Sequence, residues 1–217
     1  MNNPSVSVIE KSRFHHFFLH HNNMDHSGFN EWVFYQGMLL NDLQKWWTNE
    51  GVRPSPHEGI DFCFYRDAVG FIRTLNKKTK IPALFSGKVV HIHNDFLGKS
   101  LYVQHNFHDE QGRTLFTIYG HVIPAAGLAL RDILREGDIL ATVANVTENS
   151  KMLPHLHITV AWVSDSVPYE NLDWSIINNP RMATLCNPID FIDCKFTVEK
   201  EKYKPKISLS GEHHGYR

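Results

Sequence analysis

Two short segments, far apart in the chain, carry side chains of the types that bind metal ions. PHEGIDF places His57 and Asp61 four residues apart, and PHLHITV places His155 and His157 two residues apart. On a straight strand His57 and Asp61 would lie roughly 13 Å apart, too far to share one ion. Gly59 can supply the necessary bend, because glycine adopts backbone angles that other residues avoid. We therefore expect His57 and Asp61 to converge.

The histidines of PHLHITV precede a β-rich run, and a second run, TIYGHV, carries Tyr119 and His121. On a strand, residues two apart face the same side at roughly 6 to 7 Å. His157 can then bind an ion while His155 stays beside it. The same spacing predicts that Tyr119 and His121 project from one face.

Together the segments predict a catalytic zinc site with His57, Asp61 and His157 as ligands, a set of two nitrogens and one carboxylate. Zinc with three protein ligands keeps a position for water, whose pKa then falls toward neutrality. His121 and His155 are the remaining polar groups placed to relay protons and stabilise an oxyanion. No HExxH is present, so no helical glutamate base is expected.

Each motif alone has a simpler interpretation. A lone HxH is more often a surface pair, and His91 and His93 are expected to be such a pair. Tyr119 either orients a neighbour or donates to an oxyanion, or it is a core aromatic residue. A cupin-type metal site would need a glutamate shortly after the HxH, and residues 159–163 contain none.

The elements that must position these residues are mainly strands. The spacing of the apolar residues in EWVFYQGMLLNDLQKWW predicts one amphipathic helix over residues 31–47. After Pro54 and Pro56, short β-rich runs predict an antiparallel sheet. The expected strands are 61–65, 83–93, 100–107, 114–121, 138–146 and 155–163. Residues 124–137 are either a short helix or a loop. These elements predict a His-rich segment with a helix (1–53), a catalytic domain (54–195) and a charged tail (196–217).

Composition limits the partners. With 22 Lys and Arg against 23 Asp and Glu, the net charge of −1 makes nucleic acid a poor partner. No run approaches the length of a membrane span, and no signal peptide is evident at the N-terminus. Three cysteines form no disulfide framework and are expected to be buried thiols. The oligomeric state is not indicated.

The ordered set HxGxD, YxH and PHLH resembles the M23 peptidases, the lysostaphin-like and LytM-like zinc endopeptidases that cut peptidoglycan peptides. The resemblance covers about residues 54–192 and extends to IPALFSGKVVHI, LREGDILATVAN and CNPIDFI. It implies a mainly β fold, with the antiparallel, duplicated-hybrid-motif-like core of that family, an N-terminal helix and peripheral loops. Two departures are Met152-Leu153, where the family usually has Thr-Gly, and Val122, where a leucine often stands.

Carried over, the resemblance implies Zn²⁺ on His57, Asp61 and His157, with His121 and His155 catalytic. The expected function is a zinc metalloendopeptidase that hydrolyses peptidoglycan stem or cross-link peptides. The alternative is a non-catalytic binding or regulatory module with a structural or blocked metal site. A peptidoglycan substrate would place the protein in the cell envelope or outside the cell, whereas the lack of a signal peptide leaves the cytoplasm open.

Overall fold

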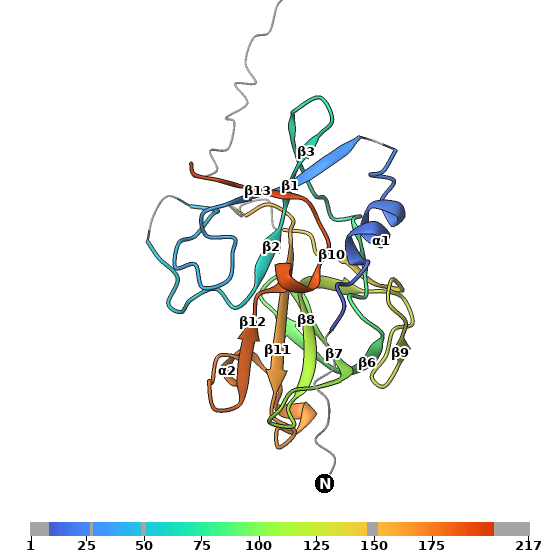
Figure 1. Ribbon diagram of the computed structural model, residues 1–217, viewed down its shortest axis with the longest axis vertical. Coiled ribbons are helices and arrows are strands. Elements are labelled where there is room, and N and C mark those ends of the chain that lie inside the picture. The colour runs from blue at the N-terminus through green and yellow to red at the C-terminus, as the bar shows by residue number, and fades with distance from the viewer. Residues whose placement is uncertain (1–8, 27, 49–50, 147–151, 202–217) are drawn as a thin grey trace, which may run out of the picture.

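The structure is a computed structural model that describes residues 9–26, 28–48, 51–146 and 152–201 (Figure 1). It is mainly β and its strand pairs are mostly antiparallel, which confirms the predicted fold class. The elements in chain order are α1 (Phe14–His21), β1 (Phe29–Tyr35), β2 (Ile60–Phe62), β3 (Phe64–Asp67), β4 (Ile72–Thr74), β5 (Lys80–Pro82), β6 (Gly87–Asp95), β7 (Gly98–His108), β8 (Thr114–Pro124), β9 (Ile133–Leu134), β10 (Ile139–Val143), β11 (Leu156–Val163), the 3₁₀ turn η1 (Tyr169–Asn171), α2 (Trp174–Ile177), β12 (Ala183–Cys186), the 3₁₀ turn η2 (Pro188–Phe191) and β13 (Phe196–Glu199).

The large sheet has the strand order β12-β11-β8-β7-β6-β9, with β2 added to β11 and β10 added to β8. The central strands β8 and β11 are buried on both faces, so they read as nearly continuous apolar runs. One face packs against the main core, and the other packs against a second apolar cluster that includes Val167, Leu172 and Ile177. Each of the expected strand segments contains a strand.

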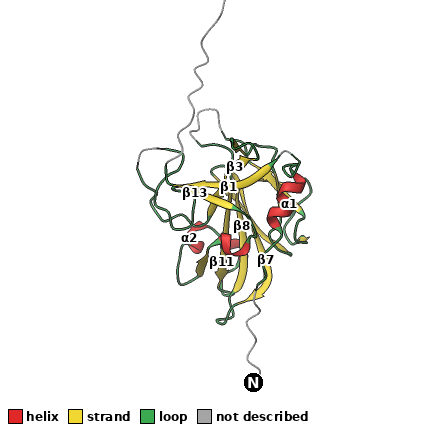
Figure 2. Ribbon diagram, turned by 45° about the horizontal axis from the view of Figure 1, so that its top comes forward, coloured by secondary structure: helices red, strands yellow, loops and turns green. Residues whose placement is uncertain are grey.

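A smaller sheet, β13-β1-β3-β4, lies across one end of the large sheet (Figure 2). Its strand β1 replaces the first part of the helix expected over residues 31–47, and turns follow it, so that prediction was wrong. Trp32, Val33 and Phe34 are all buried, since β1 has neighbours on both edges and packs on both faces. Pairing with β3 and β13 therefore overrode the helical spacing.

The N-terminal helix is α1, in the His-rich segment, with Phe14 and Phe18 one turn apart on its buried face. These rings share one core with Trp32 and with Phe62 of β2, so the core is continuous across the expected boundary at residue 54. At the other end, the first residues of the expected tail form β13. Residues 202–217 of that tail lie outside the described residues.

The remaining expectations concern loops, thiols and membrane spans. Residues 124–137 form turns and the short strand β9, so the loop alternative is correct. All three cysteines are free, with Cys63 buried and Cys186 and Cys194 partly buried. Within the described residues, no helix has the length and apolarity to cross a membrane.

Candidate metal centre

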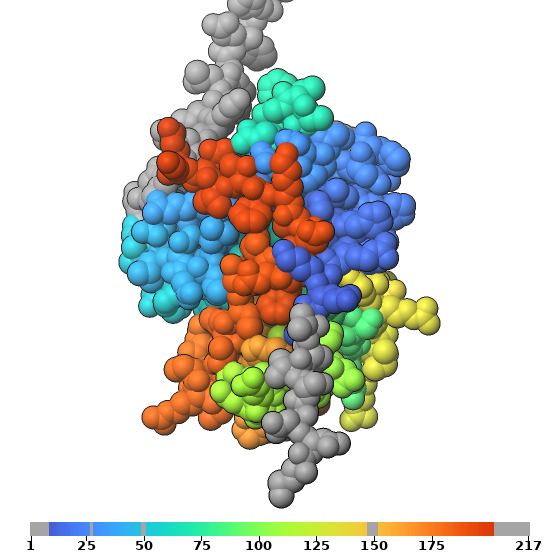
Figure 3. Space-filling view, viewed as in Figure 1, coloured from blue at the N-terminus to red at the C-terminus, as the bar shows by residue number. Residues whose placement is uncertain are grey.

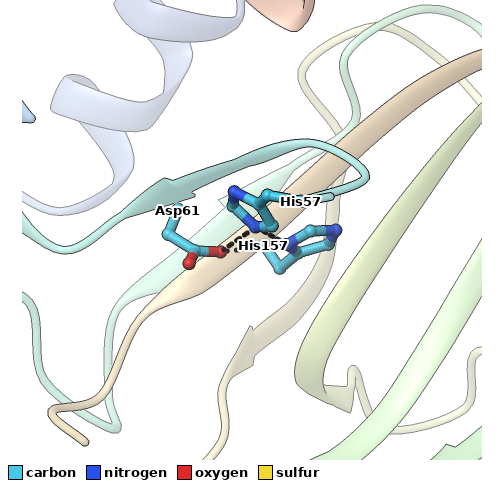
Figure 4. A group of neighbouring side chains, drawn as sticks. All are labelled: His57, Asp61 and His157. Carbon is cyan, nitrogen blue, oxygen red and sulfur yellow. Dashed lines mark hydrogen bonds and ion pairs between the residues drawn. The ribbon is translucent and has the colours of Figure 1, made fainter. Parts of the chain in front are cut away.

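His57, Asp61 and His157 meet at the junction of β2 and β11. Asp61 on β2 pairs directly with His157 on β11, and His57 lies in the loop that enters β2. The Nε2 atom of His57 lies 3.0 Å from Nδ1 of His157 and 3.2 Å from Oδ1 of Asp61. Nδ1 of His157 lies 2.9 Å from the same carboxylate oxygen. Figure 4 shows the three groups pointing toward one another, as the sequence analysis expected.

Gly59 makes this convergence possible for a different reason from the one expected. It lies in a bend, but it is not among the glycines with positive φ. A Cβ atom at Gly59 would instead lie 2.1 Å from the carbonyl oxygen of Ile158 on β11. Glycine is needed because the loop passes directly against the β11 backbone, which brings His57 and Asp61 beside His157.

Each histidine has an outer hydrogen-bond partner on the nitrogen that faces away from the centre. Nδ1–H of His57 donates to the carbonyl oxygen of Leu39 at 3.1 Å. Nε2 of His157 lies 2.8 Å from Oγ1 of Thr159, a hydroxyl that can accept its proton. When the protons lie on these outer nitrogens, both inner nitrogens carry lone pairs, as metal-binding imidazoles do.

The inner atoms fit a zinc ion. Two lone pairs and a carboxylate oxygen that face one another repel unless a cation lies among them. Ligand atoms on tetrahedral zinc, with bonds of about 2.0 to 2.2 Å, lie roughly 3.3 Å apart. The observed separations of 2.9, 3.0 and 3.2 Å are close to that value. All three residues are at least 96% buried, so water cannot screen this repulsion well.

The ionisation of the ligands agrees with this fit. Burial raises the pKa of Asp61, but the neighbouring His57 and His157 more than offset it and hold that pKa well below its usual range. Burial lowers the pKa of His157, and Asp61 opposes this only in part. The carboxyl group is therefore ionised and the imidazole neutral near pH 7, which are the forms that bind metal.

His121 enters the same site through an irregularity in β8. Lys99 of β7 pairs with Val122, while Leu101 pairs with Tyr119, so β8 contains an extra residue at this point. His121 has a φ of 61°, in the left-handed region. Such a bulge redirects a side chain, and the His121 ring lies 5.9 Å from the ring of His157.

The bulge overturns the expectation that Tyr119 and His121 share a face. Tyr119 pairs with Ile158 on the core side of the sheet and is fully buried. Its hydroxyl accepts a hydrogen bond from the backbone N–H of Leu84 at 2.6 Å. Tyr119 thus lies in the core, which is the second of the two alternatives weighed for it, and it is not among the residues that line the groove at the metal centre.

His155 lies just before β11, with its ring centroid 4.8 Å from that of His121. Its Nδ1–H donates to the carbonyl oxygen of Leu153 at 2.8 Å, which leaves Nε2 with a lone pair. Burial lowers the pKa of His155 to about 4, although Asp61 opposes the shift. His155 is therefore a neutral hydrogen-bond acceptor near pH 7.

Asp95, at the end of β6, is a site residue that the sequence analysis missed. Its Oδ2 lies 3.0 Å from Nδ1 of His121 and accepts a hydrogen bond from Oγ of Ser100 at 2.9 Å. Burial raises the pKa of Asp95, but these contacts outweigh it and lower the pKa to about 2. No local motif marks Asp95, because its contact with His121 depends on the β6–β7 turn meeting the β8 bulge.

Two further residues that were missed, Trp46 and Arg53, hold the second oxygen of Asp61. Nε1–H of Trp46 donates to Oδ2 at 2.7 Å, and Nη2 of Arg53 lies 3.3 Å from the same atom. Both precede the strands of the large sheet. The sequence analysis placed Trp46 on the apolar face of the helix expected over residues 31–47, and that helix does not form.

Arg53 and Asp95 line one groove of about 350 Å³ together with the histidines and Asp61. Its lining includes the three residues of the candidate metal centre, His121 and His155, and the aromatic residues Trp47, Phe96 and Trp174. His91 and His93 lie on β6 outside this lining, and they are not in the three-residue metal group found among the described residues.

Comparisons with known proteins show which family the chain belongs to. The model of peptidase family M23 matches residues 55–168, more than half of the chain. No match is found among curated proteins. Among solved structures, the catalytic domain of lysostaphin from Staphylococcus simulans is 17% identical, with a TM-score of 0.44, over 83% of this chain and 98% of that one.

Two further structures are similar to this chain. The solution structure of lysostaphin is 20% identical, with a TM-score of 0.41, over 63% of this chain. The match spans 43% of that lysostaphin chain, less than half of its length. The SpoIIQ–SpoIIIAH pore-forming complex is 17% identical, with a TM-score of 0.47, over 86% of this chain and 93% of that one.

The matched segment contains both ligand-bearing motifs, the bulged strand β8 and the strand β11. The extent of this match, with the His57, Asp61 and His157 group inside it, identifies the chain as a member of peptidase family M23.

Proposed function

We propose that this protein is a zinc metalloendopeptidase that hydrolyses peptide bonds in peptidoglycan stem or cross-link peptides. The observation that carries the proposal is the inward orientation of three metal-binding atoms beside two histidines that are not ligands. Membership of family M23 supports peptidase chemistry, and a peptidoglycan substrate rests on the resemblance to that family.

The side chains of the site have different roles in the proposed hydrolysis. His57, Asp61 and His157 would hold zinc through Nε2, Oδ1 and Nδ1. When bound, zinc makes a water molecule more acidic and polarises the scissile carbonyl group. The chain's own contribution is then to orient that water, to move its proton and to stabilise the charge that develops on the carbonyl oxygen.

His121 and His155 suit different parts of that task. With Nδ1 beside Asp95, His121 presents Nε2 to the groove, where it can accept a proton from water and donate it to the leaving amine. Protonated His121 can also donate to the oxyanion. His155 presents a lone pair on Nε2 and accepts a hydrogen bond from the attacking water, which it thereby orients.

The groove suits an extended peptide more than a compact metabolite. Its volume of about 350 Å³ lies at the small end of ligand sites, so only the residues near the scissile bond fit inside. Trp47, Phe96 and Trp174 offer apolar walls, while Lys45 and Glu58 place one charge of each sign at the groove.

The test is digestion of purified peptidoglycan by the zinc-loaded protein, with mass spectrometry of the released fragments. We expect new amino and carboxyl termini within the stem or cross-link peptides. His121→Ala should abolish these products while the zinc content stays at the wild-type value, because His121 is not a ligand. Zinc-loaded wild-type protein that binds peptidoglycan without cutting it would contradict the proposal and favour the non-catalytic module.

A further inference from the structure

The loop of residues 36–48, which precedes the segment matched to family M23, contacts the proposed metal centre through Leu39 and Trp46. Figure 3 shows this loop, in light blue, on the surface of the molecule. We propose that Trp46 in this loop and Arg53 after it are positioning residues for the Asp61 ligand. In this arrangement, which rests on the proposed zinc site, the loop is a permanent part of the metal centre.

The two oxygens of Asp61 have separate partners. Oδ1 faces the inner nitrogens of His57 and His157, at 3.2 and 2.9 Å. Oδ2 faces Trp46 and Arg53, at 2.7 and 3.3 Å. Both outer partners are donors only, so they occupy Oδ2 and leave Oδ1 for the ion. Asp61 would therefore bind zinc through one oxygen, and a position for water is preserved.

Trp46 is held firmly enough to position the carboxylate. It is 2% exposed. Its ring makes edge contacts with Phe64 and with His155, with centroids 5.8 and 5.1 Å apart. The indole therefore cannot turn without disturbing both the core and a proposed catalytic histidine.

Arg53 connects the ends of the loop to the same carboxylate. Its Nε donates to the carbonyl oxygen of Gln44 at 3.1 Å, and its Nη2 donates to that of Gly37 at 3.0 Å. The guanidinium lies 4.7 Å from the ring centroid of Trp47, a cation–π distance. Gly37 has a φ of 99°, and a Cβ there would lie 2.8 Å from the backbone nitrogen of Trp46. Glycine is therefore required for this close approach.

The backbone of the loop holds the other parts of the ligand segment. The N–H of Asp61 donates to Met38 O at 2.9 Å, and the N–H of His57 donates to Asp42 O at 3.0 Å. The carbonyl of Leu39 fixes the ring of His57 through Nδ1–H. Loss of the loop would thus leave two ligands without their supports. It would not simply open the groove.

The test measures zinc affinity by competition with a chromogenic chelator, on the full chain. Trp46→Phe keeps an aromatic ring but removes the indole N–H donor. Arg53→Met removes the guanidinium group and its charge. We expect each substitution to weaken zinc binding by about 10- to 100-fold, the usual effect of losing a partner that orients a ligand. Trp162→Phe is the matched control, because Trp162 lies on the core face of β11, and wild-type affinity is expected for it.

A spectroscopic measurement separates positioning from folding. Cobalt(II) replaces zinc, and its visible absorption reports the number and geometry of the ligands. With Oδ2 released, Asp61 can bind through both oxygens, so we expect weaker, shifted cobalt bands in both variants and unchanged bands in Trp162→Phe. Far-UV circular dichroism checks that each variant is folded. If a variant is not folded, Arg53→Lys, which keeps the charge, is measured in its place.

The outcomes distinguish this inference from the proposed function. Wild-type protein that binds no zinc refutes both. Wild-type protein that binds zinc, with folded Trp46 and Arg53 variants of equal affinity and unchanged cobalt spectra, refutes only the positioning role.

Discussion

The carboxylate of Asp95 and the imidazole of His121 lie 3.0 Å apart, where the end of β6 meets the bulge of β8. His155, on the other side of the centre, instead donates to the neutral carbonyl of Leu153. A carboxylate stabilises an imidazolium, whereas a carbonyl in a buried site does so much less. The two histidines are thus distinguished by their outer partners, a carboxylate for His121 and a neutral carbonyl group for His155.

Asp95→Asn should reduce turnover while leaving zinc binding intact. The amide keeps a similar shape but removes the charge, and its NH₂ group can force the wrong tautomer on His121. We expect kcat to fall by about 10- to 100-fold, at or below the lower end of general acid–base effects, because Asp95 acts through His121. Nitrogen-15 NMR of the zinc-loaded protein reports the His121 tautomer directly. A wild-type tautomer and kcat in Asp95→Asn would contradict the role of Asp95, and Ser100→Ala, which removes only a supporting hydrogen bond, should change both much less.

Removal of metal should destabilise the fold, because the ligands come from distant parts of the chain. An ion that binds only the folded state adds about 2.7 kcal/mol when its concentration is 100 times Kd. For a chain of this size, we expect chelation to lower Tm by several degrees and added zinc to restore it. Differential scanning calorimetry measures the shift. The Tm of His157→Ala should not change when zinc is added. A wild-type Tm that zinc does not change would argue against the site.

His105 should contribute to acid destabilisation of the core. Its Nδ1–H donates to the carbonyl of Ser86 and its Nε2 accepts from Oγ1 of Thr117. Burial lowers the pKa of His105 to about 4, although the Ser86 carbonyl opposes the shift. Between pH 4 and the ordinary histidine pKa of about 6.5, the unfolded chain binds more protons, so stability falls as pH drops through this window.

The expected contribution of His105 is about 3 kcal/mol, present in full above pH 6.5 and lost by about pH 4. Urea unfolding at a series of pH values measures it. His105→Gln, which cannot be protonated, should flatten the slope across this window relative to the wild-type protein. Parallel slopes for the two proteins would show that His105 is not the titrating group.

Gly59→Ala should damage both stability and the metal centre. The added methyl group would lie 2.1 Å from the carbonyl oxygen of Ile158, so the loop must move away from β11. We expect a loss of about 1 to 3 kcal/mol in the free energy of unfolding, together with weaker zinc binding. Gly112→Ala is the control, because its Cβ would meet nothing within 4 Å. It should lose only about 1 kcal/mol, from its left-handed backbone, and keep zinc affinity.

The motifs were enough to predict that the three side chains of the proposed metal centre meet, because their donor chemistry and their positions on strands are local properties. The spacing of His57 and Asp61, with PHLH on a strand, was enough to expect a shared ion, and β2 pairs with β11 at Asp61 and His157. The sheet strands were predictable for the same reason. The face of Tyr119 was not, because a single bulged residue reverses the alternation that the prediction assumed.

The helix expected over residues 31–47 and the partners of Asp61 and His121 were not predictable from local patterns. Trp32 and Trp46 fit a helical period, but one is buried in β1 and the other reaches Asp61 from a loop. Arg53 and Asp95 carried no motif at all. Their roles arise only when segments distant in sequence pack together, which a local pattern does not encode.

Zinc-edge anomalous diffraction from a crystal of the zinc-loaded protein tests the central claim most directly. It locates the ion and identifies the atoms that bind it. We predict a single strong peak in the groove, about 2.0 to 2.2 Å from Nε2 of His57, Oδ1 of Asp61 and Nδ1 of His157. A zinc peak elsewhere, or no peak among these three side chains in a zinc-saturated crystal, would contradict the account.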